Sequence, residues 1–219
     1  IEGGDRRTLA LPQSQQNLIN EISKINKNLA VVLVAGSAVT MNSWLDNVPA
    51  ILDVWYPGEQ GGNAIFDVIF GKVNPSGKLP ITFPKSYSQY PANFYSYDSK
   101  IEYKEDIYVG YRYFDKYKKE VLFPFGHGLS YTDFKYSKLK VSTKKNITNV
   151  CVKIENIGNS DGADVIQLYV RDLKSSVDRP IKELKAFKKI HLKKGGKKTI
   201  EFKLTERAFA FWDSVSKDW

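Results

Sequence analysis

The first half of the chain opens with apolar residues at helical spacing. Leu18, Ile19, Ile22 and Ile25 recur at that period, and Pro12 before them suits the first turn of a helix. We therefore predict a helix that begins near Pro12 and ends near Ile25.

Two stretches that follow are apolar on successive residues instead of on every second one. They read LAVVLVAGS and AILDVWY. Such runs are typical of strands that are buried on both faces of a parallel sheet. After the second run, PGEQGG leads into NAIFDVIF, a predicted short helix that stops at Gly71 as its C-terminal cap. Alternating helices and strands predict a layered α/β domain.

The second half changes to a period of two, which is typical of strands with one buried face. The predicted inward positions are Val150, Val152 and Ile154 in NVCVKIEN, and Ile200, Phe202 and Leu204 in KTIEFKLT. ENIGNSDGADVIQLYV is predicted to form strand, turn and strand, with Gly158 and Gly162 supplying the turn. Several short alternating strands at this spacing predict an antiparallel β-sandwich.

The change of pattern divides the chain into three regions. Residues 1–84 are predicted to form part of an α/β sandwich domain. The boundary is placed at residue 84 because three prolines near it exclude a continuing helix. The Tyr-rich residues 85–118 are expected to bridge the domains and to be packed at an interface. Residues 119–219 are predicted to form the β-sandwich, and we expect its last strand to lie beyond Trp219.

The positive charge of the chain is concentrated in the sandwich half. Residues 1–116 carry 11 Lys and Arg against 12 Asp and Glu, whereas residues 117–219 carry 22 against 12, which gives the net charge of +9. Lysines at strand ends and turns usually protect sheet edges, and this pattern lacks the interleaved Arg and aromatic residues of a nucleic-acid platform. We therefore expect a solvated surface and no nucleic-acid partner. No apolar run reaches the roughly 18 to 20 residues that cross a bilayer, so no membrane partner is expected.

Residue types that often carry catalysis or bind metals are sparse. His127 and His191 lie far apart without Cys or His neighbours, so we expect no metal site. The single cysteine, Cys151, is predicted to face outward beside no base, which argues against a nucleophilic thiol. One cysteine is typical of a reducing compartment, and also of secreted bacterial enzymes without disulfides. The turn PGEQGGN lacks the lysine of a phosphate cradle and is interpreted as tight strand-to-helix packing.

Several segments of the chain resemble glycoside hydrolase family 3. DVWYPGEQGGNAIFDVIFGKVNPSGKLPITFPKS is similar to the end of that family's α/β sandwich domain. EDIYVGYRYFD and LFPFGHGLSYTDFKYS are similar to its passage into a fibronectin type III-like domain, and VKIENIGNSDGADVIQLYV and RPIKELKAFKKI continue in the family's order. The resemblance spans nearly the whole chain. It implies an α/β plus all-β fold, with a layered α/β sandwich domain followed by an antiparallel fibronectin type III-like β-sandwich.

The resemblance also implies a role for the first residues. Many members of the family carry a Glu-Gly-x-Asp-Arg segment whose Glu is the catalytic acid/base, and the matching residues here are Glu2, Gly3, Gly4, Asp5 and Arg6. A preceding (β/α)8-type barrel would then carry the nucleophilic Asp and most sugar-binding residues. The chemistry agrees, because a retaining glycosidase needs two carboxyl groups about 5–5.5 Å apart, one of them protonated.

The activity that the resemblance implies is that of a retaining, exo-acting glycoside hydrolase, which needs no metal and no organic cofactor. A β-glucosidase that hydrolyses an oligosaccharide or aryl glucoside is our interpretation, with this chain alone inactive. Two alternatives stay open. One is a β-xylosidase of the same family, because barrel residues chiefly set the choice of sugar. The other is a non-catalytic carbohydrate-binding fragment, because such sandwiches are common scaffolds.

Aromatic residues are interpreted in two ways. Trp55, which follows a buried strand, is predicted to belong to the core. Trp44, Tyr108, Tyr111 and Tyr113 are candidates for the entrance of a substrate cleft, where flat side chains stack on sugar rings. For the three tyrosines, packing between domains is the preferred interpretation.

Overall fold

The computed structural model describes residues 8–91, 103 and 105–219. The chain divides into two compact units. The first, called the α/β unit here, consists of Ile1–Phe70 and Leu79–His127, and the second, called the sandwich unit, consists of Gly71–Lys78 and Gly128–Trp219. No helix of the described residues is long and apolar enough to cross a membrane.

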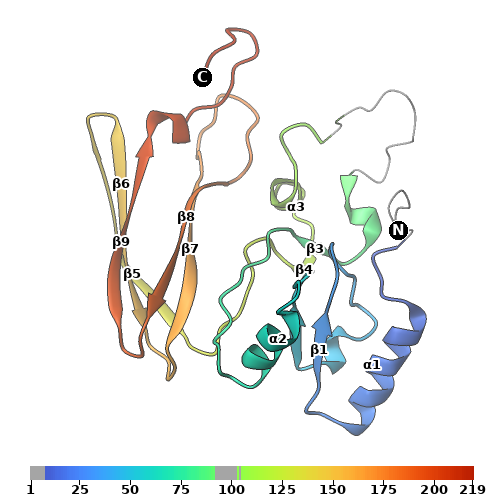
Figure 1. The fold of residues 1–219 in the computed structure, drawn as a ribbon. Helices are drawn as coiled ribbons and strands as arrows, with labels where there is room; N and C mark the ends of the chain where they lie inside the picture. The colour runs from blue at the N-terminus through green and yellow to red at the C-terminus, as the bar shows by residue number, and fades with distance from the viewer. Residues whose placement is uncertain (1–7, 92–102, 104) are drawn as a thin grey trace. The chain divides into compact units, whose positions relative to one another are not determined.

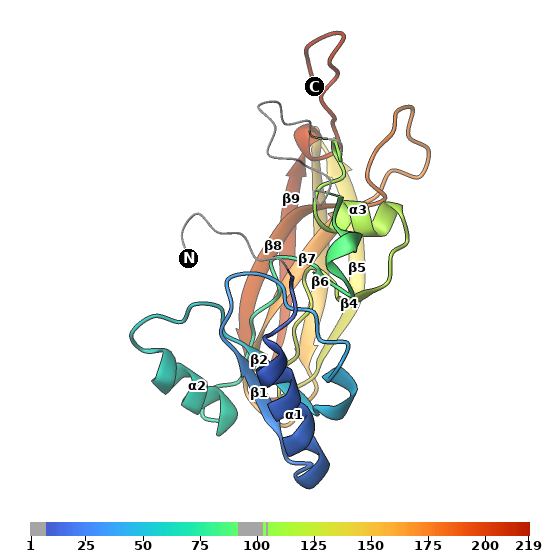
Figure 2. The ribbon, with the colours of Figure 1, turned by 90° about the vertical axis from the view of Figure 1, so that its right-hand side faces the viewer.

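The α/β unit is layered around a pair of parallel strands. Its elements in chain order are α1 (Gln13–Ile25), β1 (Ala30–Leu33), η1 (Leu45–Asn47), β2 (Ala50–Asp53), α2 (Gly61–Ile69), β3 (Phe83–Pro84), η2 (Tyr87–Gln89), α3 (Tyr111–Lys116) and β4 (Val121–Phe123). β1 pairs in parallel with β2, and β3 pairs antiparallel with β4. α1 and α2 lie on opposite sides of the parallel pair (Figures 1 and 2). The layered α/β prediction is confirmed.

Both helices predicted from the apolar spacing are present. α1 begins directly after Pro12. Leu18 and Ile25 are 59% and 86% exposed, so the apolar stripe of this helix is only partly buried. α2 ends at Ile69, and Gly71 follows with φ +74°, the left-handed conformation that glycine adopts at helix ends. The predicted C-terminal cap is confirmed.

The core of the α/β unit is formed chiefly by the chain between β1 and β2. Its buried members are Leu33, Ala38, Val39, Met41, Trp44, Val48 and Phe83. Trp44 is 0% exposed, so its expected place at a cleft entrance is wrong: it is the largest side chain of this core. Trp55 packs against the cluster, edge-on to Phe83, as predicted.

Burial of β1 and β2 on both faces, as the continuous apolar runs suggested, is wrong for the described chain. In β1 only Leu33 is buried, while Ala30 is exposed. No residue of β2 is buried. The reason is that each strand has one hydrogen-bonded neighbour among the described residues, and a two-stranded sheet offers the flanking helices little area to cover.

The sandwich unit packs a three-stranded sheet on a two-stranded one. Its elements are β5 (Phe134–Lys144), β6 (Ile147–Asn156), β7 (Gly162–Val170), β8 (Glu183–Leu192), β9 (Lys197–Thr205) and η4 (Glu206–Ala208). The strand orders are β5-β6-β9 and β7-β8, all antiparallel (Figure 1). The core consists of Val150, Val152, Ile154, Ile166, Ile190, Leu192, Ile200, Phe202 and Leu204. All six predicted inward positions of β6 and β9 are among them, and the antiparallel sandwich is confirmed.

Gly158 and Gly162 serve close packing rather than turn conformation. Neither has a positive φ. A Cβ on Gly158 would collide with Thr132 Oγ1, and one on Gly162 would lie 2.7 Å from Thr132 Cγ2. The connection they flank carries the chain from one sheet to the other, because β6 pairs with β5 and β9 while β7 pairs with β8. Only a residue without a side chain fits beside Thr132 at both positions.

Residues 71–78 precede β3 in the sequence but belong to the sandwich unit. Asn74 donates from Nδ2 to Asp161 O at 3.0 Å and accepts from Ser130 Oγ at 2.8 Å. Lys78 Nζ lies 3.0 Å from Asp164 Oδ1 and donates to Gly128 O at 2.6 Å. The chain therefore passes between the two units three times, after Phe70, after Lys78 and after His127.

Candidate functional site

The predicted catalytic residue lies outside the described residues. Glu2 and the rest of its segment, Gly3 to Arg6, precede Thr8, where the description begins. The chain directly after the segment is anchored to the α/β unit. Leu9 is 8% exposed, and Thr40 N donates to Leu9 O at 3.0 Å. Ala10 forms a parallel bridge with Thr40.

The carboxyl ends of β1 and β2 meet at one edge of the sheet, which is where α/β proteins commonly place ligands. Asp53 is the last residue of β2, and its Oδ2 is buried without a hydrogen-bond partner among the described residues. Its Oδ1 accepts from Trp55 N at 3.4 Å. Burial raises the pKa of the Asp53 carboxyl, and the Trp55 N–H opposes that rise. This carboxyl is a candidate proton or hydrogen-bond donor that sequence reasoning missed, although its place at a strand end was a signal.

Two aromatic residues, Trp55 and Tyr56, follow shortly after Asp53 in the chain. Trp55 adopts φ +51°, a left-handed conformation that is strained for a side chain of this size. Tyr56 is 78% exposed, yet a Cβ on Gly36 would lie 2.6 Å from its ring. The loop after β1 therefore needs glycine where Tyr56 crosses it. Together these contacts present a flat, exposed phenol ring at the carboxyl edge of the sheet.

The turn PGEQGG is shaped by backbone packing, in agreement with its interpretation from sequence. Gly58 has φ +68°, and a Cβ on Gly61 would lie 2.6 Å from the Pro57 ring. Glu59 is exposed on the turn. The two glycines thus allow the chain to fold tightly from β2 into α2.

The tyrosines of the region 85–118 make ring contacts inside the α/β unit. Tyr108 is 6% exposed, and Lys116 Nζ donates to its hydroxyl at 2.7 Å. Tyr111 stacks on Phe125 with centroids 4.9 Å apart. Packing between domains and a cleft entrance both stay predictions for these side chains.

The two histidines and the cysteine lie apart from one another. His127 has its ring 5.1 Å from that of Phe123, and His191 is exposed on β8. Cys151 faces outward on β6, as predicted, and is half-buried. Within the described ranges, no group of three or more His, Cys, Asp or Glu residues could hold a metal ion.

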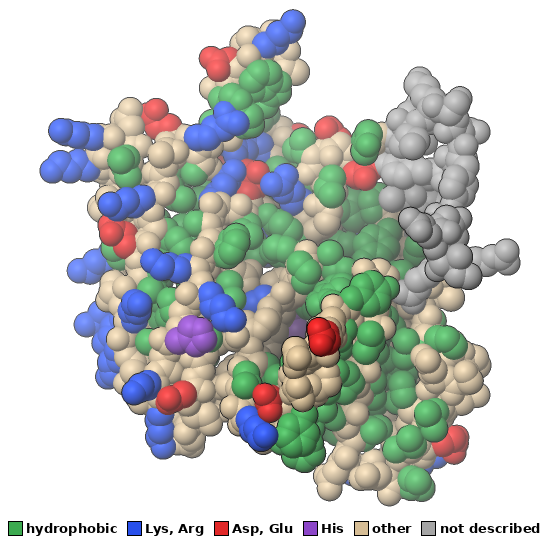
Figure 3. Space-filling model, in the orientation of Figure 1, with side chains coloured by type: hydrophobic (Ala, Val, Ile, Leu, Met, Phe, Trp, Pro, Cys, Tyr) green, Lys and Arg blue, Asp and Glu red, His purple; other side chains and the backbone are tan. Residues whose placement is uncertain are grey.

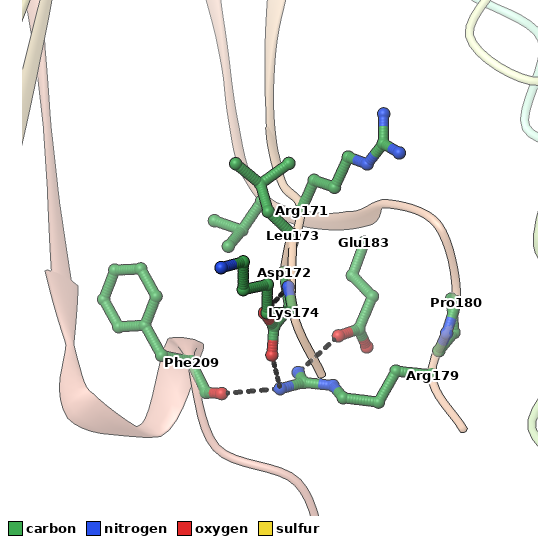
Figure 4. Close-up of a pocket in the computed structure, with 9 residues that line it drawn as sticks. Arg171, Asp172, Leu173, Lys174, Arg179, Pro180, Glu183 and Phe209 are labelled. Carbon is green, nitrogen blue, oxygen red and sulfur yellow. Dashed lines mark hydrogen bonds and ion pairs between the residues drawn. The ribbon is translucent and has the colours of Figure 1, made fainter. Parts of the chain in front are cut away.

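A pocket of about 530 Å³ lies in the sandwich unit, beside the loop between β7 and β8 (Figure 4). Arg179 is one of the residues that line it, and its Nη1 donates to Phe209 O at 2.9 Å while its Nη2 donates to Glu183 Oε2 at 2.8 Å. Asp172 Oδ2 lies 4.0 Å from Nη1. Because Glu183 and Asp172, the two carboxylates that line the pocket, are both engaged with the Arg179 guanidinium, we interpret the arrangement as a structural clamp.

Comparison with protein families finds two matches. Residues 1–131 match the glycosyl hydrolase family 3 C-terminal domain, and residues 164–219 match the fibronectin type III-like domain.

Relatives align with the chain over its whole length. It is 48% identical to thermostable beta-glucosidase B of Acetivibrio thermocellus and 42% identical to an exo-alpha-(1->6)-L-arabinopyranosidase of Bifidobacterium breve. It spans 30% and 29% of the lengths of these proteins. Its fold superposes on the crystal structure of a family 3 beta-glucosidase of Bifidobacterium adolescentis with a TM-score of 0.96 and 43% identity, over 100% of this chain and 33% of that one.

Proposed function

Because this chain belongs to glycoside hydrolase family 3, we propose that it forms the C-terminal portion of a retaining, exo-acting β-glucosidase. The substrates proposed are short β-linked glucosides, from which terminal glucose is released. The observation that carries the proposal is the alignment of the whole chain with 30% of a beta-glucosidase at 48% identity. The activity would require a preceding barrel domain that supplies the nucleophile.

In this proposal Glu2 is the general acid/base of a double displacement. Its carboxyl first gives a proton to the departing glycosidic oxygen, while a carboxylate of the barrel attacks the anomeric carbon. The same group then removes a proton from the water that hydrolyses the glycosyl-enzyme. Glu2 must be protonated at the start, so its site should raise the pKa through apolar surroundings or a neighbouring carboxylate.

The anchor behind the Glu2 segment supports this role. A general acid must be held within hydrogen-bond reach of the leaving oxygen, and small displacements cost rate. Leu9 and the Ala10–Thr40 bridge fix the chain a few residues after Glu2. Asp5 and Arg6 are proposed to pair with each other or with the barrel and to hold the remaining turn.

The experiment joins this chain to a family 3 barrel and compares Glu2→Gln with the parent protein on aryl β-glucosides. We expect Glu2→Gln to lower kcat by roughly 10² to 10⁴, the usual contribution of a general acid/base. Azide should restore turnover and give a β-glucosyl azide, because an anionic nucleophile needs no base. Glu59→Gln, a change at an exposed carboxylate of the same unit, serves as the control and should leave kcat unchanged. Full activity in Glu2→Gln would overturn the assignment.

The same experiment separates the alternatives. A β-xylosidase or an arabinopyranosidase would keep the dependence on Glu2 and would prefer the corresponding aryl pentoside as substrate. The arabinopyranosidase is included because a relative from Bifidobacterium breve carries that activity in its name. A non-catalytic carbohydrate-binding fragment would instead leave hydrolysis by the joined protein independent of Glu2.

A further inference from the structure

The outer face of the sheet β5-β6-β9 carries a continuous track of lysines. Residues paired across an antiparallel ladder lie on the same face, and inward Val150, Val152 and Ile154 define the opposite one. The five outward rows, each written from β5 through β6 to β9, are Lys135–Glu155–Lys197, Ser137–Lys153–Thr199, Lys140–Cys151–Glu201, Ser142–Asn149–Lys203 and Lys144–Ile147–Thr205. Every row contains at least one lysine.

The track has a strong excess of positive charge at short spacing. Its 15 positions hold six lysines against two glutamates. Rows are roughly 6.8 Å apart along the strands, and neighbouring strands are roughly 4.8 Å apart, which is within a Debye length at physiological salt. The potentials of the lysines therefore add. In Figure 3, Lys and Arg side chains follow the margin of the sandwich unit where Figure 1 draws these strands.

Among the residues that the structure describes, most of these lysines have no carboxylate as an ion-pair partner. Within the outward rows, Lys197 Nζ forms an ion pair with Glu155 Oε1 at 2.9 Å. The hydrogen bond from Lys197 and the nearby charges of Lys153 and Lys135 lower the pKa of Glu155, so several lysines act on a single carboxylate. Lys140, Lys144 and Lys203 are exposed farther along the track.

We propose that this lysine track binds an acidic polysaccharide. Between the lysines stand Ser137, Ser142, Asn149, Thr199 and Thr205, whose hydroxyl and amide groups can bond sugar hydroxyls while the lysines meet uronate carboxylates. The lysines supply point charges that tolerate variable geometry, which suits a repeating polymer better than a single bidentate ligand. The exposed sheet face offers such a polymer an extended path.

The composition of the face argues against nucleic acid as the occupant. Proteins that bind single strands stack bases on aromatic side chains, and none of the 15 outward positions is aromatic. None is an arginine, the residue that most often reads guanine in a duplex groove. The hydroxyl-rich, lysine-bearing surface therefore fits a chain of sugar acids.

Affinity electrophoresis of the whole chain through gels containing polygalacturonate tests the proposal. The track variant Lys140→Gln/Lys144→Gln/Lys203→Gln should weaken retardation about tenfold or more, since each lysine near an anionic surface contributes substantially. The control variant Lys174→Gln/Lys188→Gln/Lys189→Gln removes equal charge at exposed positions outside the outward rows and should retain binding within about twofold. Lysine-to-arginine changes at the three track positions should also retain it.

Three results would overturn the proposal. The first is equal loss in the track and control variants, which would mean attraction by net charge alone. The second is binding of duplex DNA or of anionic lipid vesicles at least as tight as that of polygalacturonate at the same salt. The third is the absence of retardation. Thermal unfolding of each variant verifies that it folds, and because the readout is binding, the outcome does not depend on Glu2 or on hydrolysis.

Discussion

Lys78 Nζ lies 3.0 Å from Asp164 Oδ1, with the side chains 20% and 12% exposed. The two residues are far apart in sequence, and their ion pair fixes the segment Gly71–Lys78 onto β7. Tyr136 donates its hydroxyl hydrogen to the other carboxylate oxygen of Asp164. A segment that precedes the sandwich in the chain is thus built into the sandwich unit by a largely buried, fully bonded carboxylate.

Replacing Lys78 by Met should destabilise the sandwich unit. The change leaves Asp164 buried without its cation, and removal of one partner of a buried pair typically costs about 3 kcal/mol or more of the free energy of unfolding. Urea unfolding together with amide hydrogen exchange in β7 would measure the loss.

The matched control is Lys197→Met, which breaks the Lys197–Glu155 pair in the same unit. Lys197 is 51% exposed there, so water replaces the lost interaction and the effect should be much smaller. Equal effects of the two substitutions would contradict a special role for the Lys78–Asp164 pair.

Gly128→Ala should also destabilise the sandwich unit. A Cβ at this position would collide with the backbone oxygen of Gly77 and lie 3.0 Å from Lys78 Cδ, so the segment would have to move away. Overpacking of this kind costs typically about 1–3 kcal/mol of the free energy of unfolding. Gly77→Ala tests the opposite side of the same contact, where a Cβ meets open space, and should be close to neutral. Thermal unfolding of the two variants measures the difference, and similar melting temperatures would refute the steric argument.

The parts of the fold that follow from local pattern were predictable from the sequence. Alternation in β6 and β9 identifies the buried face because a strand turns every second side chain to the same side. α1 follows from its helical spacing for the same kind of reason, and Gly71 marks the end of α2.

Features that depend on distant partners were not predictable. Trp44 is a core residue because it packs in one buried cluster with Met41 and Phe83, and no local pattern indicates that packing. Gly158 and Gly162 are glycines because Thr132 packs beside them. At the candidate site, the resemblance gives Glu2 and the position after a strand gives Asp53, but the unpaired state of its Oδ2 depends on tertiary packing.

Tyr136 should make stability depend on alkaline pH. Burial first, and then the hydrogen bond and charge of Asp164, raise the pKa of Tyr136 above its ordinary value of 10.0. The folded state therefore keeps the phenol proton that the unfolded state loses. This contribution is fully present below pH of about 10 and is lost as the pH rises beyond that value toward the folded-state pKa. Tyr136→Phe should flatten the decline above that pH, as measured by urea unfolding. An equally steep decline in Tyr136→Phe would show that other groups cause it.

Asp53 should have an influence of the same sign, but in the acidic range of pH. Burial raises its pKa above the ordinary 3.8, so the folded state favours the protonated carboxyl. The contribution to stability is therefore present below the unfolded-state pKa and is lost as the pH rises through the folded-state pKa. Asp53→Asn keeps the shape without the charge, so it should stabilise the α/β unit at neutral pH and give no gain near pH of about 3. Asp46→Asn, at an exposed position on η1, should change stability equally little at both values. Unfolding curves at the two pH values decide the matter, because a loss of stability in Asp53→Asn at neutral pH would mean that the carboxylate has a partner that stabilises its charge.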